Sequence, residues 1–176
     1  MQLFSVLRAG VLASGLVLAP AAALASFLVE PDPHWEEDEV TMPPPPEEKS
    51  LREFFVTSAS SNVFMVDEAS LDVGGDGVVR YVLVVRTSGG AENVTYEGIR
   101  CNTGERRIYA HGRPDGEWAP ARRSEWEPLR HGSYNMPQSI LAAQHFCDGP
   151  APPRSRAAAL RGLRSGSERW RSESWR

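Results

Sequence analysis

The nine residues VVRYVLVVR, from Val78 to Arg86, restrict the fold more than any other stretch of the chain. Side chains of a strand alternate between its two faces, so every second residue from Val79 to Val85 shares one wholly apolar face. The other face is apolar in its centre and charged at its ends. This pattern is typical of a central strand whose second face is partly covered. The chain is therefore predicted to build a β-sheet around residues 78–86.

Turn signals on either side of this strand predict its neighbours. The paired glycines of TSGGAE, at residues 87–92, allow positive φ and predict a hairpin to a strand at residues 93–101. After a turn at NTGE, the segment RRIYAHG is expected to return as a third strand. Two shorter strands are expected upstream, at residues 62–67 and 70–74.

The predicted strand at residues 93–101 changes its hydrophobic phase at Gly98. Its apolar residues before and after this glycine fall on opposite faces. A β-bulge at Gly98 would turn all of them toward the core. It would also leave Glu97 and Arg100 together on the other side, facing solvent.

One helix is expected near the end of this sheet. The segment MPQSILAAQHFC, residues 136–147, has Pro137 at a favoured helix-start position and then apolar residues at helical spacing. The predicted fold class is α+β, mostly β: a small antiparallel meander sheet with a C-terminal helix packed on it, flanked by disordered ends.

The first 25 residues have the pattern of a secretory signal peptide. Arg8 precedes an apolar run, and ALA at residues 23–25 matches the small-x-small pattern of a cleavage site, which would leave Ser26 as the mature N-terminus. The run is short for a membrane span and contains Pro20. We therefore expect a soluble protein that is exported to the periplasm.

Cys101 and Cys147 are the two cysteines of the chain. In an oxidising compartment, an even pair is most simply a disulfide, and the alternative is a free reactive thiol.

Charge divides the mature chain into three parts. Residues 26–50 form an acidic, Pro-rich segment that is expected to be extended, and residues 51–149 a single globular β-rich domain. Residues 150–176 form an Arg-rich tail with the composition of a disordered segment. The mixture of arginine and tryptophan in this tail can also bind a membrane or an acidic partner, but its glycines and serines favour solvated disorder. Nucleic acid is not an expected partner of an exported protein.

The central part of the chain carries a distinctive set of motifs. VDEASLDVGGDGVVRYVLVVRTSGGAENVTYEGIRC is followed by YAHG, by two spaced tryptophans, Trp118 and Trp126, and by a late FC. Together they resemble the cryptic neisserial protein one-like domain, a family of exported bacterial proteins of uncharacterised function. The similarity covers about Trp35 to Cys147, with the basic tail outside it. The resemblance implies a periplasmic domain and supplies no catalytic residue.

Four polar residues on the two strands at 93–101 and 106–112 form the candidate site: Glu97, Arg100, Tyr109 and His111. The simpler interpretation is a surface ladder of cross-strand pairs, each contributing less than about 1 kcal/mol. The functional interpretation is a shallow platform that binds a small ligand or an envelope protein, with arginine recognising an anionic group.

No metal or cofactor is predicted. The histidines lack the spacing of a helical zinc pair, and DVGGDG at residues 72–77 lacks two calcium-loop ligands and is expected to be a turn. The sequence also lacks a nucleophile elbow, a P-loop and a dinucleotide fingerprint. The leading hypothesis is a non-enzymatic periplasmic binding or interaction module. Its rival is a small cell-envelope hydrolase that uses Glu97, Tyr109 and His111.

Overall fold

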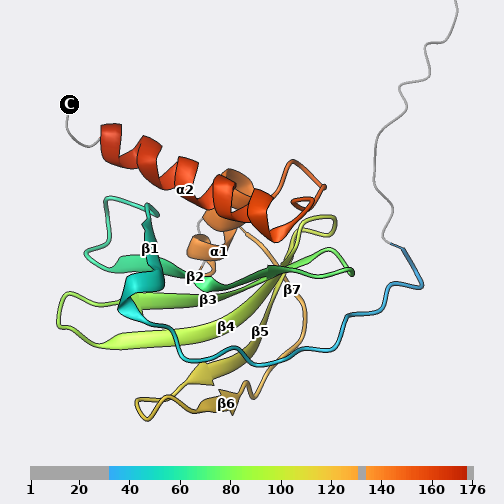
Figure 1. Cartoon of the computed structure of the whole chain (residues 1–176), viewed down its shortest axis with the longest axis horizontal. Coiled ribbons are helices and arrows are strands. Elements are labelled where there is room, and N and C mark those ends of the chain that lie inside the picture. Colours follow the sequence, from blue (N-terminus) through green and yellow to red (C-terminus); the bar gives the residue numbers. More distant parts are fainter. Residues whose placement is uncertain (1–31, 131–133, 174–176) are drawn as a thin grey trace, which may run out of the picture.

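The strand predicted at residues 78–86 lies in the middle of a seven-stranded sheet. The computed structural model describes residues 32–130 and 134–173, so the predicted signal peptide lies outside the described residues. The strands form an antiparallel meander, which confirms the predicted fold class, and the short β7 adds to the edge of β5 (Figure 1). The strands are β1 (Leu51–Phe54), β2 (Val63–Val73), β3 (Val78–Arg86), β4 (Glu92–Arg100), β5 (Glu105–Gly112), β6 (Trp118–Pro120) and β7 (Glu127–Pro128).

Tight turns join the central strands, as the sequence predicts. Gly77 and Gly90 adopt positive φ values of 77° and 83° in the turns before and after β3. Upstream, the two short strands that were expected are one continuous strand, β2. Its pairing with β3 is irregular between Asp67 and Asp72, which explains why the sequence pattern breaks there.

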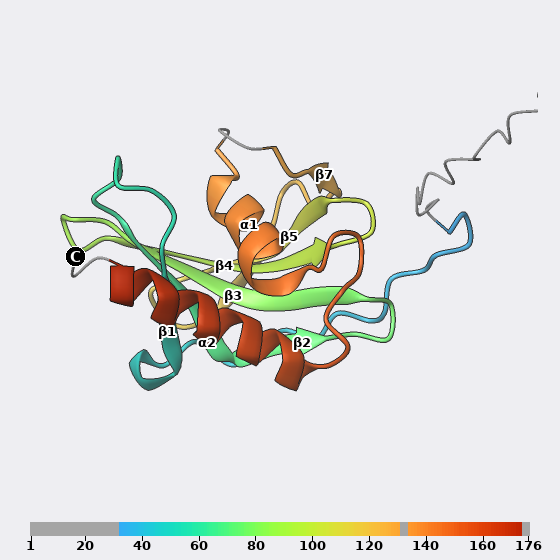
Figure 2. The ribbon, with the colours of Figure 1, turned by 90° about the horizontal axis from the view of Figure 1, so that it is seen from above.

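Helices cover one face of the sheet, which we call the helix face (Figures 1 and 2). The predicted helix is α1 (Met136–Ile140), which continues as a π-helical turn, η2 (Leu141–Phe146). A second helix, α2 (Arg156–Glu173), follows and packs on η2, β1 and β2. Phe146 fills the core beneath the helices, with its ring 5.5 Å from that of Tyr81 on β3.

The packing of α2 depends on two glycines that face η2. A Cβ at Gly162 would lie 2.0 Å from the carbonyl oxygen of His145, and one at Gly166 would lie 2.3 Å from the His145 ring. Arg156 holds the start of the helix, because its guanidinium donates a hydrogen bond of 2.7 Å to the carbonyl oxygen of Leu71. The helix is therefore fixed to the sheet by both shape and hydrogen bonding.

This helix corrects the prediction of a disordered tail at residues 150–176. Residues 156–173 are helical, and Ala159 and Leu163 are fully buried against the sheet. The composition was misleading because glycine usually weakens a helix. Here two glycines allow the close contact that stabilises the helix by tertiary packing.

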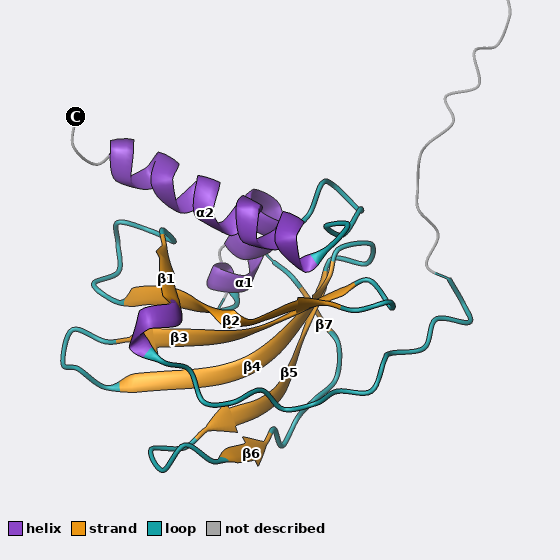
Figure 3. Ribbon diagram, in the orientation of Figure 1, coloured by secondary structure: helices purple, strands orange, loops and turns teal. Residues whose placement is uncertain are grey.

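The opposite face of the sheet, which we call the strap face, is crossed by residues 32–50, the strap (Figures 1 and 3). The strap has little regular structure apart from the 3-10 turn η1 (Glu48–Ser50). Val40 packs into the apolar cluster of this face, and the indole N–H of Trp118 donates a hydrogen bond of 2.7 Å to the carbonyl oxygen of Pro43. The strap is extended, and it is docked on the sheet rather than solvated.

The bulge predicted at Gly98 is wrong. β4 pairs with β3 without interruption, and the irregularity lies on β5, where Tyr109 is the extra residue. The apolar residues of β4 lie on both faces, with Tyr96 toward the strap and Ile99 toward the helices. Gly98 leaves room for Tyr109, whose phenol oxygen would lie 2.3 Å from a Cβ at this position. Since both faces are covered, the phase change needs no bulge.

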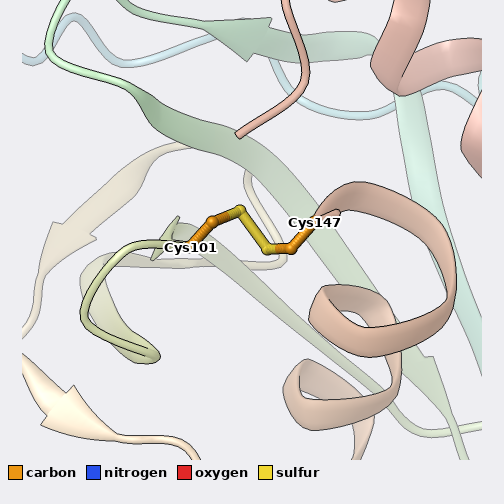
Figure 4. The surroundings of a disulfide bond; sticks show 2 residues. All are labelled: Cys101 and Cys147. Carbon is orange, nitrogen blue, oxygen red and sulfur yellow. A yellow bond between two sulfur atoms is a disulfide. The ribbon is translucent and has the colours of Figure 1, made fainter. Parts of the chain in front are cut away.

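The predicted disulfide between Cys101 and Cys147 is present (Figure 4). The two Cα atoms lie 5.6 Å apart, and the cysteines immediately follow β4 and η2. The bridge therefore ties the end of a central strand to the helical layer above it.

Candidate functional site

The helix face is left open at its β5 end, because α2 packs on β1 and β2 at the other end. A cavity of about 530 Å³ lies there, between β5, β6 and the segment that leads to β7. A second cavity of about 290 Å³ extends toward β4 and α1. The two share Arg106, Ile108, His111 and Tyr134, and together we call them the β5 cleft.

The bulge on β5 determines which side chains line this cleft. Arg106 and Ile108 are two residues apart and face the helices, as strand geometry requires. His111 would face the strap in a regular strand. Because Tyr109 is an extra residue, His111 instead pairs with Thr95 and returns to the helix face.

Glu97 lies at the inner end of the cleft and is only 1% exposed. Its carboxylate accepts hydrogen bonds from the hydroxyl of Thr95 at 2.6 Å and from the amide of Gln138 at 2.9 Å. Burial raises the pKa of Glu97, and the hydrogen bonds from Thr95 and Gln138 oppose this effect. The Oε1 atom of Gln138 is buried and has no hydrogen-bond partner within the described part of the chain. The inner end therefore presents a carboxylate that resists ionisation beside an unused amide oxygen.

One wall of the cleft is a packed group of three side chains. Arg106 donates a hydrogen bond of 3.0 Å to Glu127, and its guanidinium lies 5.0 Å from the ring centroid of Tyr134. The hydroxyl of Tyr134 also donates to Glu127, and this bond lowers the pKa of the Glu127 carboxyl. The charge of Arg106 is thus neutralised within the wall.

The rim of the cleft carries two further arginines, which are not held by a close ion pair. Arg122 and Arg123 line the cleft and are exposed. Neither forms an ion pair or a hydrogen bond with any residue of the ranges 32–130 and 134–173. Arg123 interacts with the charge of Glu127 only at longer range than an ion pair, so both arginines remain available to a ligand in the cleft that His111 also lines.

The structure separates the four residues that were predicted to share one platform. Glu97 and His111 line the β5 cleft, whereas Arg100 and Tyr109 lie under the strap. The predicted solvent-facing position of Glu97 is wrong, since this residue is buried. With no bulge at Gly98, Glu97 and Arg100 are three residues apart on a regular strand and point to opposite faces.

The same separation affects the predicted catalytic cluster. The hydroxyl of Tyr109 donates a hydrogen bond of 2.6 Å to Glu37 of the strap. Burial and this bond raise the pKa of Tyr109. Because Tyr109 faces the strap, the sheet lies between it and the pair Glu97 and His111, so the three do not converge on one substrate.

Sequence reasoning missed several residues of the cleft, including Arg106, Gln138 and Tyr134. Arg106 shares a face with Ile108 by simple alternation, but the sequence does not show that the β5 bulge brings His111 beside them. Gln138 lies in the first turn of α1, and nothing in the sequence marks it as buried. The doublet Arg122 and Arg123 was the one available signal, as a local concentration of like charge.

Replacing Glu97 by glutamine is expected to flatten the dependence of stability on pH. Because its folded-state pKa is raised above the ordinary value of 4.5, the folded chain binds more protons than the unfolded chain between these two pKa values. The wild-type free energy of unfolding therefore contains a contribution that is complete below pH 4.5 and is lost as the pH rises through the folded-state pKa. Denaturant unfolding of both chains between about pH 4 and about pH 8 measures the difference.

Glu125→Gln is the matched control for this measurement. Glu125 lines the same cleft but is exposed, so its variant should keep the wild-type slope. If Glu97→Gln also follows the wild-type curve at every pH, the Glu97 carboxyl does not have a raised pKa.

Within residues 32–130 and 134–173, no three histidine, cysteine, aspartate and glutamate side chains are grouped so that they could hold a metal ion. None of the helices in these ranges is both long and apolar enough to span a membrane.

Comparisons with known proteins give one family and one relative. The model of the CNP1-like family matches residues 30–164, a range that includes the whole strap, the whole sheet and half of α2. The chain is also similar to Cryptic neisserial protein 1 of Neisseria gonorrhoeae, at 27% identity over 101 residues. That match covers 50% of this chain and 49% of the relative, so the chain spans about half the length of that protein. No solved structure matches the chain.

Proposed function

Because the chain belongs to the CNP1-like family, whose function is uncharacterised, we propose a role from the site itself: a non-enzymatic binding module of the periplasm. Its ligand is a small molecule or an envelope protein that presents an anionic group to the β5 cleft. The signal-like first 25 residues support the location. Nucleic acid is not among the proposed ligands.

The observation that carries this proposal is the pair of exposed guanidiniums at the rim. Arg122 and Arg123 have no ion-pair partner within the described ranges, although Glu125 and Glu127 line the same cleft. Arginine suits the recognition of carboxylate or phosphate groups because its planar fork donates two parallel hydrogen bonds. His111, which is exposed and lines the same cleft, supplies a further polar contact for a ligand.

The hydrolase alternative has less support. It requires Glu97, Tyr109 and His111 to act on one bond, and Tyr109 is turned to the opposite face of the sheet. Glu97 is enclosed by Thr95 and Gln138 and lies well below the rim. A binding role needs only the arginines at the rim, which are accessible.

A photo-crosslinking residue placed at Glu125 tests the proposal in the intact cell envelope. Glu125 is exposed in the cleft and is bonded to no partner within 32–130 and 134–173, so its replacement should leave the fold unchanged. Irradiation is expected to give a defined covalent adduct. The same chain with Arg122→Gln and Arg123→Gln should give at least about tenfold less adduct, because each lost charge-assisted hydrogen bond is worth about 1.5–3 kcal/mol.

The matched control removes the same charge elsewhere. Arg113 and Arg161 are both exposed, in the β5–β6 turn and on α2, and neither lines the cleft. Arg113→Gln with Arg161→Gln should leave the adduct at the wild-type level. Equal loss in both double variants would mean that net charge, rather than the cleft, attracts the partner.

A further inference from the structure

The strap meets the sheet at spaced positions along its length. Trp35, Glu37, Val40 and Pro43 contact the strap face, while Glu36 and Glu39 between them are exposed. An extended segment with anchors at such intervals is how peptides are bound in recognition grooves. The strap therefore occupies its face in the manner of a bound peptide.

Glu37 is the charged anchor of the strap. Its carboxylate accepts hydrogen bonds from the hydroxyl of Tyr109 at 2.6 Å and from Arg80 at 3.3 Å, and it forms an ion pair with Arg107. The side chain of Glu37 is only 13% exposed. Removing one partner of such a buried, hydrogen-bonded charge is strongly destabilising, so the groove is selective for an acidic residue here.

Trp35 is the aromatic anchor, two residues before Glu37. Its ring stacks on the guanidinium of Arg100, with 3.6 Å between the guanidinium carbon and the ring centroid. Trp126 lies on the same guanidinium at 5.4 Å and meets Trp35 edge to face. The indole N–H of Trp35 donates a hydrogen bond of 2.9 Å to the carbonyl oxygen of Asp76. The groove thus recognises an aromatic residue and, two positions later, an acidic residue.

Every group that recognises these anchors belongs to the sheet or to the loops that join its strands. Arg80 and Arg107 lie on β3 and β5, Trp118 begins β6, and Trp126 precedes β7. The strap itself is joined to the sheet at one point, through η1 and β1. The contacts of the strap would therefore be the same if it came from another copy of the chain.

We propose that the groove of the strap face accepts the strap of a second copy, so that two chains exchange straps and form a dimer. The strap is acidic and the groove basic, which makes each copy complementary to the other in both directions, as a two-fold dimer requires. Residues 44–47, between the anchor Pro43 and η1, include three prolines that keep this segment extended, and this favours reaching a neighbour. In dilute solution each strap stays in its own groove, because a tethered segment has an effective concentration on the order of millimolar.

Two charge-reversal variants of the chain test this exchange. Glu37→Arg has a mismatched strap and a normal groove, whereas Arg107→Glu has a normal strap and a mismatched groove. Each variant alone should be monomeric in sedimentation velocity and native mass spectrometry. When the two variants are mixed, each groove finds a strap of opposite charge only on the other variant. The amount of heterodimer should therefore exceed the amount of either homodimer by at least about tenfold.

The control replaces Arg107→Glu by Arg161→Glu, which makes the same charge change on the exposed side of α2. Mixed with Glu37→Arg, it should form no heterodimer above the level of the separate chains. If either reversal variant does not fold, Glu37→Gln and Arg107→Gln form the milder pair, with one matched groove in the mixture. Folded variants that remain monomeric after mixing overturn the proposal. The proposal is also overturned if a free peptide of residues 32–47 stabilises Glu37→Arg but the mixed variants form no heterodimer. The groove would then accept the segment, but the two copies would not exchange it.

Discussion

A chain that ends at Gly149 is expected to lose its cooperative unfolding transition. Removing α2 would expose the core side of η2 and the apolar residues of β1 and β2 that the helix covers. Replacing a buried leucine such as Leu163 by alanine alone costs about 2–5 kcal/mol. Since whole domains are stable by only about 5–15 kcal/mol, loss of the entire helix should leave little of that stability. Thermal or urea unfolding followed by far-UV circular dichroism measures the effect.

Two point variants of the complete chain separate packing from length. Leu163→Ala should lower the free energy of unfolding by about 2–5 kcal/mol, because the side chain is fully buried. Arg161→Ala, two residues earlier and exposed, should change it by less than about 0.5 kcal/mol. A truncated chain that still unfolds cooperatively at the wild-type midpoint would show that α2 is not part of the folded unit.

Loss of the disulfide is the second large effect that we expect. Cys101 and Cys147 are 46 residues apart, and closing a loop of this length stabilises the folded state by about 4 kcal/mol in the chain-entropy model. The double variant Cys101→Ala with Cys147→Ala should therefore unfold at a markedly lower urea concentration than the oxidised wild type. Equilibrium unfolding with and without a reducing agent gives this difference.

The reducing agent also provides the control for this experiment. It should destabilise the wild type by nearly the same amount as the double substitution and should leave the double variant unchanged. An oxidised wild type that is no more stable than the double variant would show that the bridge does not constrain the unfolded chain.

The strands of this fold were predictable because their signals are local. Alternation in VVRYVLVVR and the glycine turns beside it predicted β3, its neighbours and the meander. The pair Cys101 and Cys147 predicted the link to the helical layer. Each of these signals comes from residues that are close together in the sequence or from the number of cysteines. It can therefore be recognised without knowledge of the tertiary packing.

The candidate site was less predictable because it depends on what covers each face. Alternation shows which residues share a face, but it does not show whether that face is solvated. Glu97 was predicted to face solvent, and it is buried because α1 brings Gln138 over it. The β5 bulge at Tyr109 has no mark in the sequence, yet it decides that His111 enters the cleft. The helix at residues 156–173 was hidden for a similar reason, since its glycines are explained only by their contact with η2.

The two covers of the sheet come from opposite ends of the described chain, and this has a consequence for the order of folding. The hairpins of the sheet join neighbours in sequence, whereas Glu37 and Tyr109 are 72 residues apart and Arg156 and Leu71 are 85 residues apart. Contacts between distant residues form more slowly because a larger loop must close. We expect the hairpins to form early. At that stage apolar side chains are exposed on both faces of the sheet, and its unpaired edge strands can aggregate. Because the chain emerges N-terminus first, the strap precedes the sheet and α2 follows it. We therefore expect the strap to cover one face of the sheet before the last helix can cover the other.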